Sequence, residues 1–241
     1  MTIKEIQQKL YERLKPSGWA DKLKMFILSN EFEHILKTLY EDSQQGKRFT
    51  PVIKDLFKAF EECPYENLKV VVIGQDPYPQ ANVADGISFS CSHTLKEQPS
   101  LRFIFDEIER TVYDPSKPQD ESVIKREDYN PDLKRWSNQG VLMLNTALTC
   151  EVNNIGSHID LWKPFVTHLL DYLASYNSGI LYVFLGKKSQ VWHKMIPTNN
   201  YKFFAPHPAA AAYTGSKWNS GDLFNNINNV LNNVYGETIV W

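Results

Sequence analysis

The stretch KVVVIGQDPYP, residues 69–79, decides the fold class of this chain. Its first half is an uninterrupted apolar run, which is typical of a short strand buried on both faces of a sheet. The run stops at Gly74, and Asp76 stands directly before Pro77, where the backbone must extend or turn. The stretch therefore predicts a buried strand that carries a carboxylate at its carboxyl end.

Similar apolar runs recur further along the chain, with segments of helical periodicity between them. Buried strands that alternate with helices imply right-handed crossovers and a parallel sheet. We therefore predict an α/β fold with a central four-stranded parallel sheet flanked by helices on both faces. The other three strands are expected at residues 141–144, 180–185 and 201–204, and helices within residues 1–15 and at 31–40, 51–60, 100–112, 159–175, 189–195 and 221–234, with a surface excursion at 113–131.

The composition fits an ordinary soluble protein that forms one domain over residues 1–241, with 42% hydrophobic and 22% charged residues. No apolar run is long enough to span a bilayer, and the first residues do not resemble a targeting presequence. The three cysteines lack any CxxC spacing, which argues for a reducing compartment and against zinc or an iron–sulfur cluster. We expect a cytoplasmic monomer without metal, other cofactor or membrane partner, and a bacterial or viral source fits.

The formal net charge is −2, from 26 Lys and Arg against 28 Asp and Glu. Proteins that bind nucleic acid are usually more basic, so this balance counts mildly against such a partner. A local basic face remains compatible with it.

Polar side chains follow the predicted strands where each strand ends, which is where parallel α/β sheets bind their ligands. Asp76, Asn145 and His207 follow three of the strands, and a Gly-Lys-Lys-Ser turn at residues 186–189 follows the other. A carboxylate, an amide and an imidazole suit the cleavage of a bond that leaves a cationic sugar and an anionic heterocycle. The sequence therefore predicts an active site at this edge of the sheet.

Each of these residues also has an ordinary structural interpretation. Asp76 and Asn145 could cap turns, His207 could be a packed loop histidine, and the nearby aromatic residues Tyr78 and Phe89 could belong to the core. For Asp76 alone that interpretation is favoured, and for each of the others alone it is reasonable. Their coincidence at one sheet edge favours the site, with the two aromatic rings as its wall and stacking surface.

Four motifs, in this order, resemble those of family 1 uracil-DNA glycosylases. GQDPYP at residues 74–79 and GISFS at 86–90 resemble the water-activating loop and base pocket, GVLMLNT at 140–146 resembles the uracil-reading strand, and APHPAA at 205–210 resembles the histidine loop. Weaker similarity extends over roughly nine tenths of the chain. The resemblance implies an enzyme that flips uracil out of DNA and hydrolyses its N-glycosidic bond, leaving free uracil and an abasic site without strand cleavage.

The resemblance also implies roles for single residues. Asp76 would stabilise the cationic sugar and position water, and His207, kept neutral, would donate to the uracil O2 atom. The implied substrate contacts are Gln75 beside uracil, Tyr78 where thymine carries its methyl group, Phe89 stacked on the base and Asn145 on its polar edge. Residues implied to contact the DNA strand are Pro99, Ser100, Ser189, Pro208, Ala209, Ala211 and Tyr213.

The histidine loop departs from the family, which usually has His-Pro-Ser-Pro-Leu-Ser and inserts the leucine into the hole left by uracil. Here residues 207–213 read HPAAAAY, so Ala209 lacks the hydroxyl and Ala211 is too small to be a wedge. Three hypotheses follow: Tyr213 or another nearby side chain stacks in the gap, flipping is weakly assisted with a preference for single strands, or the loop has no wedge role. Pro79 and Asp85 also stand where many bacterial members have histidine, which would alter the charge near a phosphate.

The expected partner is uracil-containing DNA, single- or double-stranded, and the resemblance adds a proteinaceous uracil-DNA glycosylase inhibitor as a candidate. The alternative is a catalytically weak DNA-binding or processivity module on the same fold, although such a module has no need of Asp76, Asn145 and His207 together. Tyr78 argues against a thymine-directed glycosylase. The sequence shows neither the spaced cysteines of cluster-dependent glycosylases, nor a second carboxylate for a glycoside hydrolase, nor a lysine nucleophile in the motifs.

Overall fold

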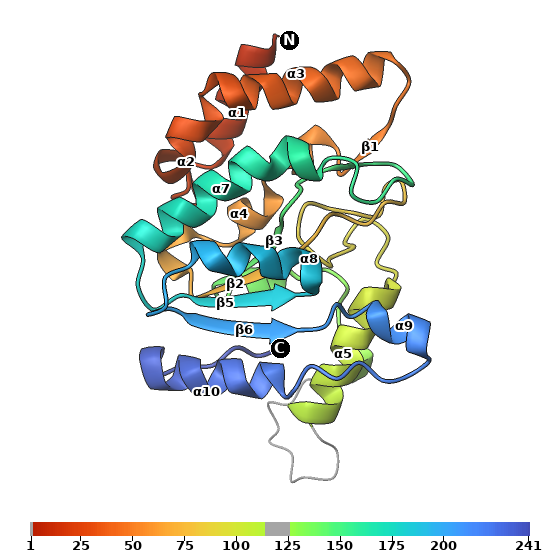
Figure 1. The fold of residues 1–241 in the computed structure, drawn as a ribbon, viewed down its shortest axis with the longest axis vertical. Helices are drawn as coiled ribbons and strands as arrows, with labels where there is room; N and C mark the ends of the chain where they lie inside the picture. The colour runs from red at the N-terminus through yellow and green to blue at the C-terminus, as the bar shows by residue number, and fades with distance from the viewer. Residues whose placement is uncertain (1, 114–125) are drawn as a thin grey trace.

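The computed structural model describes residues 2–113 and 126–241, apart from the side chains of Glu127, Tyr213 and Thr214. Its centre is a four-stranded parallel sheet in the order β3-β2-β5-β6 (Figure 1). The strands are β2 (Val70–Gly74), β3 (Val141–Asn145), β5 (Leu181–Leu185) and β6 (Tyr201–Ala205). Each predicted strand is found within one or two residues of its expected bounds, so the predicted sheet is confirmed.

Helices cover both faces of this sheet, as predicted. Figure 1 shows α7 (Ile159–Tyr176) on one face, with the N-terminal helices stacked outside it, and α10 (Leu223–Tyr235) on the other. The strand β2 is buried over its whole length, since its alternate side chains face these two layers. On the α10 side, α5 (Pro99–Thr111) contributes Ile104 to the packing around Val72.

The N-terminal region is helical, with α1 (Ile3–Arg13), α2 (Ala20–Ile27) and α3 (Asn30–Gln44). The α1 helix begins as its sequence indicates, because Thr2 and Glu5 form a reciprocal capping box. The α2 helix was not predicted, since it is short and follows Trp19, which makes no side-chain cap. Its apolar residues Leu23 and Phe26 are nevertheless buried.

The helix predicted at residues 51–60 is found only as two short pieces, one 3₁₀ turn and one short α-helix. Thr50 before Pro51 has the local sequence of a helix cap and first turn, but it lies instead in the short strand β1 (Phe49–Thr50), which pairs antiparallel with β4 (Cys150–Glu151). This pairing with a distant segment overrides the local capping signal, and Thr50 is buried. The remaining short elements are the 3₁₀ turns η1 (Ile53–Asp55), η2 (Tyr65–Asn67), η3 (Arg126–Asp128) and η4 (Val191–Met195), and the helices α4 (Lys58–Glu62), α6 (Lys134–Ser137), α8 (Lys187–Gln190) and α9 (Ala210–Thr214).

Most of the predicted surface excursion at residues 113–131 lies outside the described residues. Within the two described ranges, no helix combines the length and the apolar character needed to cross a membrane.

Candidate active site

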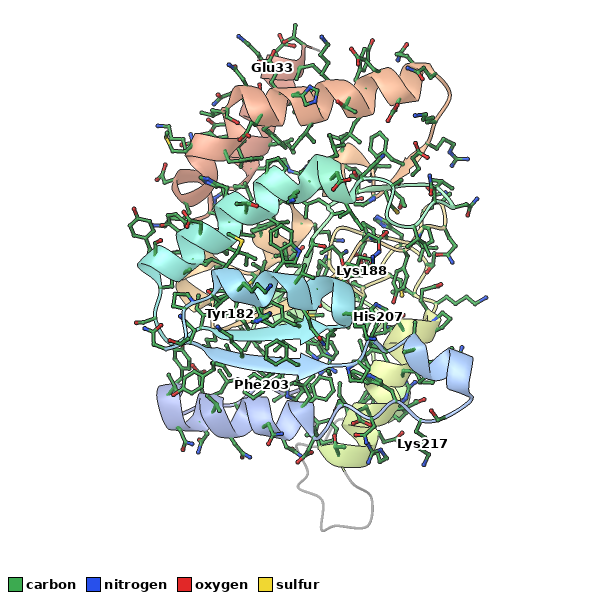
Figure 2. All side chains as sticks on the ribbon, viewed as in Figure 1. Glu33, Tyr182, Lys188, Phe203, His207 and Lys217 are labelled. Atoms are coloured by element: carbon green, nitrogen blue, oxygen red, sulfur yellow. The ribbon has the colours of Figure 1, made fainter. Side chains whose placement is uncertain are left out.

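A cavity of about 410 Å³ opens where β2, β3 and β6 end. Figure 2 shows His207 just beyond the carboxyl ends of β5 and β6, with Lys188 of α8 above it. All six residues predicted for catalysis and base binding line this cavity. Its lining consists of Gln75, Asp76, Pro77, Tyr78, Pro79, Ser88, Phe89, Ser100, Asn145, Ile155, His207, Ala209 and Ala210.

Gly74, the last residue of β2, allows the walls of the cavity to approach one another. A Cβ atom at this position would lie 2.7 Å from Ser88 Oγ and 2.8 Å from Asn145 Oδ1. Contacts this short are not tolerated, so any other residue would push these two polar groups apart. Gly74 is therefore needed at this position because it lets Ser88 and Asn145 come close to the end of β2.

Asp76 leaves β2 into the cavity and is half-buried. The backbone N–H of Gly156, from the loop between β4 and α7, donates to its Oδ2 atom. Burial raises the pKa of the Asp76 carboxyl, while the hydrogen bonds from Gly156 and from the Gln75 side chain act in the opposite direction. The carboxylate is thus oriented but incompletely solvated, so a positive charge beside it would be stabilised strongly.

Asn145 ends β3, next to Gly74 in the parallel register. Its Oδ1 atom accepts a hydrogen bond of 2.7 Å from the hydroxyl of Ser88, which is itself buried. This contact fixes the orientation of the amide, so that its NH₂ group remains available to a ligand. The next residue, Thr146, donates its hydroxyl to the carbonyl of Gln75 at 2.8 Å and ties the two strand ends together.

The aromatic wall depends on Asp85. Its carboxylate is fully buried and accepts hydrogen bonds from the backbone of Ile87 and Ser92 and, at 2.6 Å, from the hydroxyl of Ser90. The expectation that Asp85 alters the charge near a DNA phosphate is therefore wrong. It instead folds the loop that holds Phe89.

Phe89 lies in the left-handed backbone region, with a φ of 63°, and its ring is tilted against the His207 ring at 5.8 Å between centroids. A positive φ is costly for an aromatic residue and is maintained here by the hydrogen bonds of the loop. The Tyr78 hydroxyl donates to the Phe89 carbonyl at 3.1 Å. Tyr78 and Phe89 thus form two fixed aromatic sides of the cavity.

His207 follows β6 and is oriented through its Nδ1 atom, which lies 3.2 Å from the backbone N–H of Ala209. Because that N–H can only donate, Nδ1 must accept, and in the neutral ring the proton resides on Nε2. Burial lowers the pKa of His207, which favours this neutral form. Gly186 makes room for the ring, since a Cβ there would lie 2.8 Å from His207 Cβ.

The chain is similar to known proteins over most of its length. Residues 60–232 match the model of the uracil DNA glycosylase superfamily. The uracil-DNA glycosylase of Mesomycoplasma hyopneumoniae (strain 7448) is 35% identical over 83% of this chain and 86% of that protein, and that of Acinetobacter baumannii (strain AYE) is 31% identical over 100% and 98%. The chain belongs to the uracil-DNA glycosylase superfamily.

The fold of this chain is also similar to that of a solved uracil-DNA glycosylase structure. The crystal structure of mimivirus uracil-DNA glycosylase matches with a TM-score of 0.81 at 24% identity, over 96% of this chain and 88% of that one. The family match begins within α4 and contains every residue that lines the cavity. The helices α1 to α3 precede it.

Only some of the residues that the family resemblance predicted to contact DNA line the cavity. Ser100 lines the cavity at the start of α5, beside the exposed Pro99. Ser189 does not line the cavity. It is fully buried and donates its hydroxyl to the Gly186 carbonyl at 2.9 Å, so the structure does not support the prediction that it contacts the DNA strand. Pro208 is buried too.

The alanine-rich loop after His207 also differs from expectation. Ala211 is only 5% exposed and packs into the core, so its predicted place on the DNA side is wrong. The α9 helix turns this residue inward, while Ala210 and Ala212 face outward. Ala209 lines the cavity, and its N–H donates to Nδ1 of His207. The Tyr213 side chain lies outside the described residues.

Two features of the 151–158 loop were not predicted from the sequence. Ile155 lines the cavity although its side chain is 67% exposed, and Gly156 holds Asp76. The turn-forming sequence Asn-Asn-Ile-Gly at residues 153–156 could have suggested a loop, but nothing local indicates that it lies beside Asp76. The roles of Ser88 and Asp85 depend likewise on contacts between segments.

One group of side chains in the described residues has the chemistry of a metal site. Donor atoms of Asp42, Glu151 and His158 lie within 4.8 Å of one another. The Lys47 ammonium lies 2.9 Å from Asp42 and 3.4 Å from Glu151, so it already supplies a positive charge there. None of these residues lines the cavity, so we assign this group no part in the site.

Proposed function

We propose that this protein hydrolyses the bond between uracil and deoxyribose in DNA, with the cavity at the sheet edge as its active site. The observation that carries the proposal is the convergence of an oriented carboxylate, an oriented amide and a neutral imidazole on one cavity. Family membership supports the same reaction. Free uracil and an abasic site are the products.

Asp76 acts on the sugar. As the C1′–N1 bond breaks, positive charge develops on the deoxyribose, and the ionised carboxylate stabilises it at close range. Water then forms the new bond to C1′, and its proton leaves to Asp76 or to solvent. The hydrogen bond from Gly156 orients the carboxylate before the substrate arrives, so little reorganisation is needed in the transition state.

His207 and Asn145 act on the base. The electron pair of the broken bond passes to uracil, and the Nε2–H group of His207 donates to the oxygen on which negative charge develops. Because the ring is neutral, it stabilises the anion by a hydrogen bond and need not give up its proton. The amide of Asn145, fixed by Ser88, hydrogen-bonds the polar edge of the pyrimidine, and Phe89 stacks on it.

Tyr78 selects uracil over thymine. Its ring lines the cavity and is held by its hydrogen bond to the Phe89 carbonyl, so it cannot move aside easily. We infer that it occupies the space of the thymine methyl group. A packed aromatic ring excludes an added methyl group because overpacking costs about 1–3 kcal/mol.

The substrate is DNA, and the target nucleotide must leave the base stack, since a base inside a duplex cannot enter a closed cavity. Within the described lining no lysine is present to act as an amine nucleophile, so the strand is left intact. A proteinaceous inhibitor is a further candidate partner, because a mimivirus protein of the same fold has been crystallised in complex with UGI.

An excision assay tests the proposal. The protein is incubated, with EDTA present, with end-labelled oligonucleotides that hold one uracil, thymine or hypoxanthine, and alkali then reveals abasic sites. We expect alkali-dependent cleavage at uracil alone, no nick before alkali, and a loss of about 10²–10³-fold in rate for Asp76→Asn.

Absence of cleavage on both single and double strands, with DNA binding intact, would overturn the proposal and favour a binding module. Cleavage that Asp76→Asn leaves unchanged would show that the reaction occurs elsewhere.

A further inference from the structure

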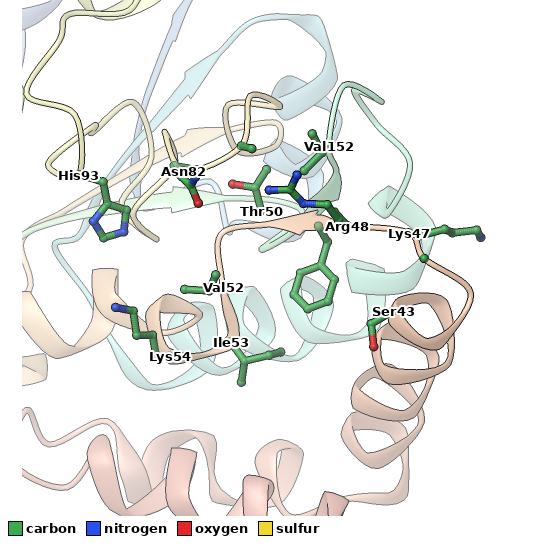
Figure 3. Close-up of a pocket in the computed structure, with 14 residues that line it drawn as sticks. Ser43, Lys47, Arg48, Thr50, Val52, Ile53, Lys54, Asn82, His93 and Val152 are labelled. Carbon is green, nitrogen blue, oxygen red and sulfur yellow. The ribbon is translucent and has the colours of Figure 1, made fainter.

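A second, larger hollow lies beside the active-site cavity, on the same side of the molecule. This groove has a volume of about 690 Å³ and is formed between the β1–β4 pair, the start of η1 and the loop after Pro79 (Figure 3). None of the residues that line it belongs to the active-site cavity. The function described above does not account for it.

The groove is basic, although the chain as a whole has a net charge of −2. Its lining includes Lys47, Arg48, Lys54 and His93 and contains no aspartate or glutamate. Lys47 is neutralised by Asp42 and Glu151, and His93 lies 2.9 Å from Asp55. Arg48 and Lys54 are exposed, and neither forms an ion pair within the described part of the chain. A hollow with two unpaired cations attracts anions.

The floor between these cations is apolar. Figure 3 shows Arg48 towards one end of the groove and Lys54 towards the other, with Val52 between them; Phe49 also lines the groove. Val52 is 46% exposed, and Phe49 is half-buried. Separated positive charges over an apolar floor match a single nucleic-acid strand, whose phosphates alternate with sugars and bases.

The groove lies close to the active-site cavity. Pro79 lines the active-site cavity and Ala81 lines the groove, two residues further on, so the two rims are at most about 7 Å apart along the chain. The Pro79 carbonyl accepts from Asn153, and the Arg48 carbonyl accepts from Val152 at 2.7 Å. The loop that holds Asp76 thus also holds Arg48, which directly precedes β1.

We propose that this groove binds the DNA strand on one flank of the everted uracil, with Arg48 and Lys54 in contact with its phosphates. The inference rests on the proposed function, because it takes uracil-containing DNA as the ligand. It places part of the grip on DNA in the segment before the family's motifs, away from the alanine-rich loop after His207.

Binding of oligonucleotides of different length tests the proposal. The probes carry one 2′-fluoro-deoxyuridine, which resists cleavage, in a strand of about five nucleotides or in the same strand extended by about four thymidines at the 5′ or at the 3′ end. Affinity is measured by fluorescence anisotropy over a range of salt concentrations. The proteins are the wild type, the double variant R48Q/K54Q and the matched control K4Q/K9Q, which removes two exposed cations from α1 without touching the groove.

We expect one of the two extensions to tighten binding to the wild type and to K4Q/K9Q by about tenfold, and R48Q/K54Q to lose most of that gain. For two phosphates on a single strand, the salt slope of the double variant should be shallower by about 1.4. The shortest probe should bind all three proteins alike.

The proposal is overturned if neither extension tightens binding, or if K4Q/K9Q loses as much as R48Q/K54Q. A groove that serves a protein partner would give the first of these results. Cleavage of the shortest strand with ordinary uracil distinguishes failure of the groove assignment from failure of the proposed function. If the wild type and R48Q/K54Q both cleave it while extensions have no effect, only the groove assignment fails. If the wild type cleaves neither this strand nor longer single and double strands, the proposed function fails.

Discussion

The two sides of the active-site cavity are built differently. The Asp76 side, which consists of Asp76 and the 151–158 loop, is held by hydrogen bonds between distant segments, from Gly156 to Asp76 and from Asn153 to Pro79. The His207 side, which consists of His207 and residues 208–212, is held mainly by hydrogen bonds within its own turn, such as that from Ala210 to the His207 carbonyl. The first is cross-linked to the rest of the fold, and the second is a local turn.

The side chains differ in the same way. The His207 side presents alanines to the cavity, whereas the Asp76 side presents Ile155, with 67% of its side chain exposed. In the proposed mechanism the two sides share the chemistry, because each contributes one group that acts on the breaking bond. Apolar contact with DNA is not shared, and we expect it to come chiefly from the Asp76 side. This division can be tested by removing one contribution at a time.

The largest effect is expected for His207→Ala. Loss of the donor to the developing anion should lower the rate of uracil excision by about 10²–10³-fold, with DNA affinity little changed. Single-turnover kinetics on a uracil oligonucleotide measure this, and His34→Ala, an exposed histidine of α3, is the matched control. A loss below tenfold would mean that the His207 side only shapes the cavity.

The pH dependence of kcat/KM reports both sides together. Asp76 must be ionised, and burial raises its pKa; His207 must be neutral, and burial lowers its pKa. Activity should therefore fall as the pH decreases, by about tenfold per pH unit, with a midpoint between the usual values of about 3.9 for Asp and about 6.5 for His. A midpoint above the usual histidine value would contradict the neutral, buried imidazole.

Ser88→Ala should cost about tenfold in kcat/KM for uracil. The substitution removes the hydrogen bond that orients Asn145, and a buried bond of this kind contributes about 0.5–1.5 kcal/mol. Ser175→Ala, at an exposed serine of α7 that lines neither hollow, serves as the control. If Ser88→Ala excises uracil at the wild-type rate, the orientation of Asn145 does not depend on this contact.

Ile155→Ala is expected to have the smallest effect, a loss of about fivefold on duplex DNA and less on single strands. The reason is that an apolar contact at the rim stabilises the everted nucleotide, and truncating it costs about 1 kcal/mol of buried apolar surface. Val191→Ala, which truncates a side chain exposed to a similar degree elsewhere, should have no effect. Equal losses on single and double strands would remove Ile155 from base eversion.

The sequence predicted most of the framework for a physical reason. Buried parallel strands appear as continuous apolar runs, and their carboxyl ends meet at one edge, so Asp76, Asn145 and His207 could be placed together without coordinates. All three line one cavity. The capping box of α1 was likewise a local signal that the structure confirms.

What the sequence could not show depends on contacts between distant segments. The strand β1 forms only because β4 lies beside it, and Asp85 is structural only because the loop folds around it. The burial of Ser189 and Ala211 follows from how α8 and α9 are turned against the sheet, which no local pattern records. Ile155 could be recognised as a residue at the rim of the cavity only from the structure, which places its loop beside Asp76.

In the proposed mechanism, Asp76 stabilises the sugar cation while His207 stabilises the base anion. Excision of 5-fluorouracil tests it directly, because fluorine makes the departing base a more stable anion while adding little bulk near Tyr78. Single-turnover rates are compared for uracil and 5-fluorouracil in the wild type, Asp76→Asn and His207→Ala. We predict that 5-fluorouracil restores a large part of the loss in His207→Ala and little of the loss in Asp76→Asn. Equal restoration in both variants, or restoration in Asp76→Asn alone, would contradict this division of roles.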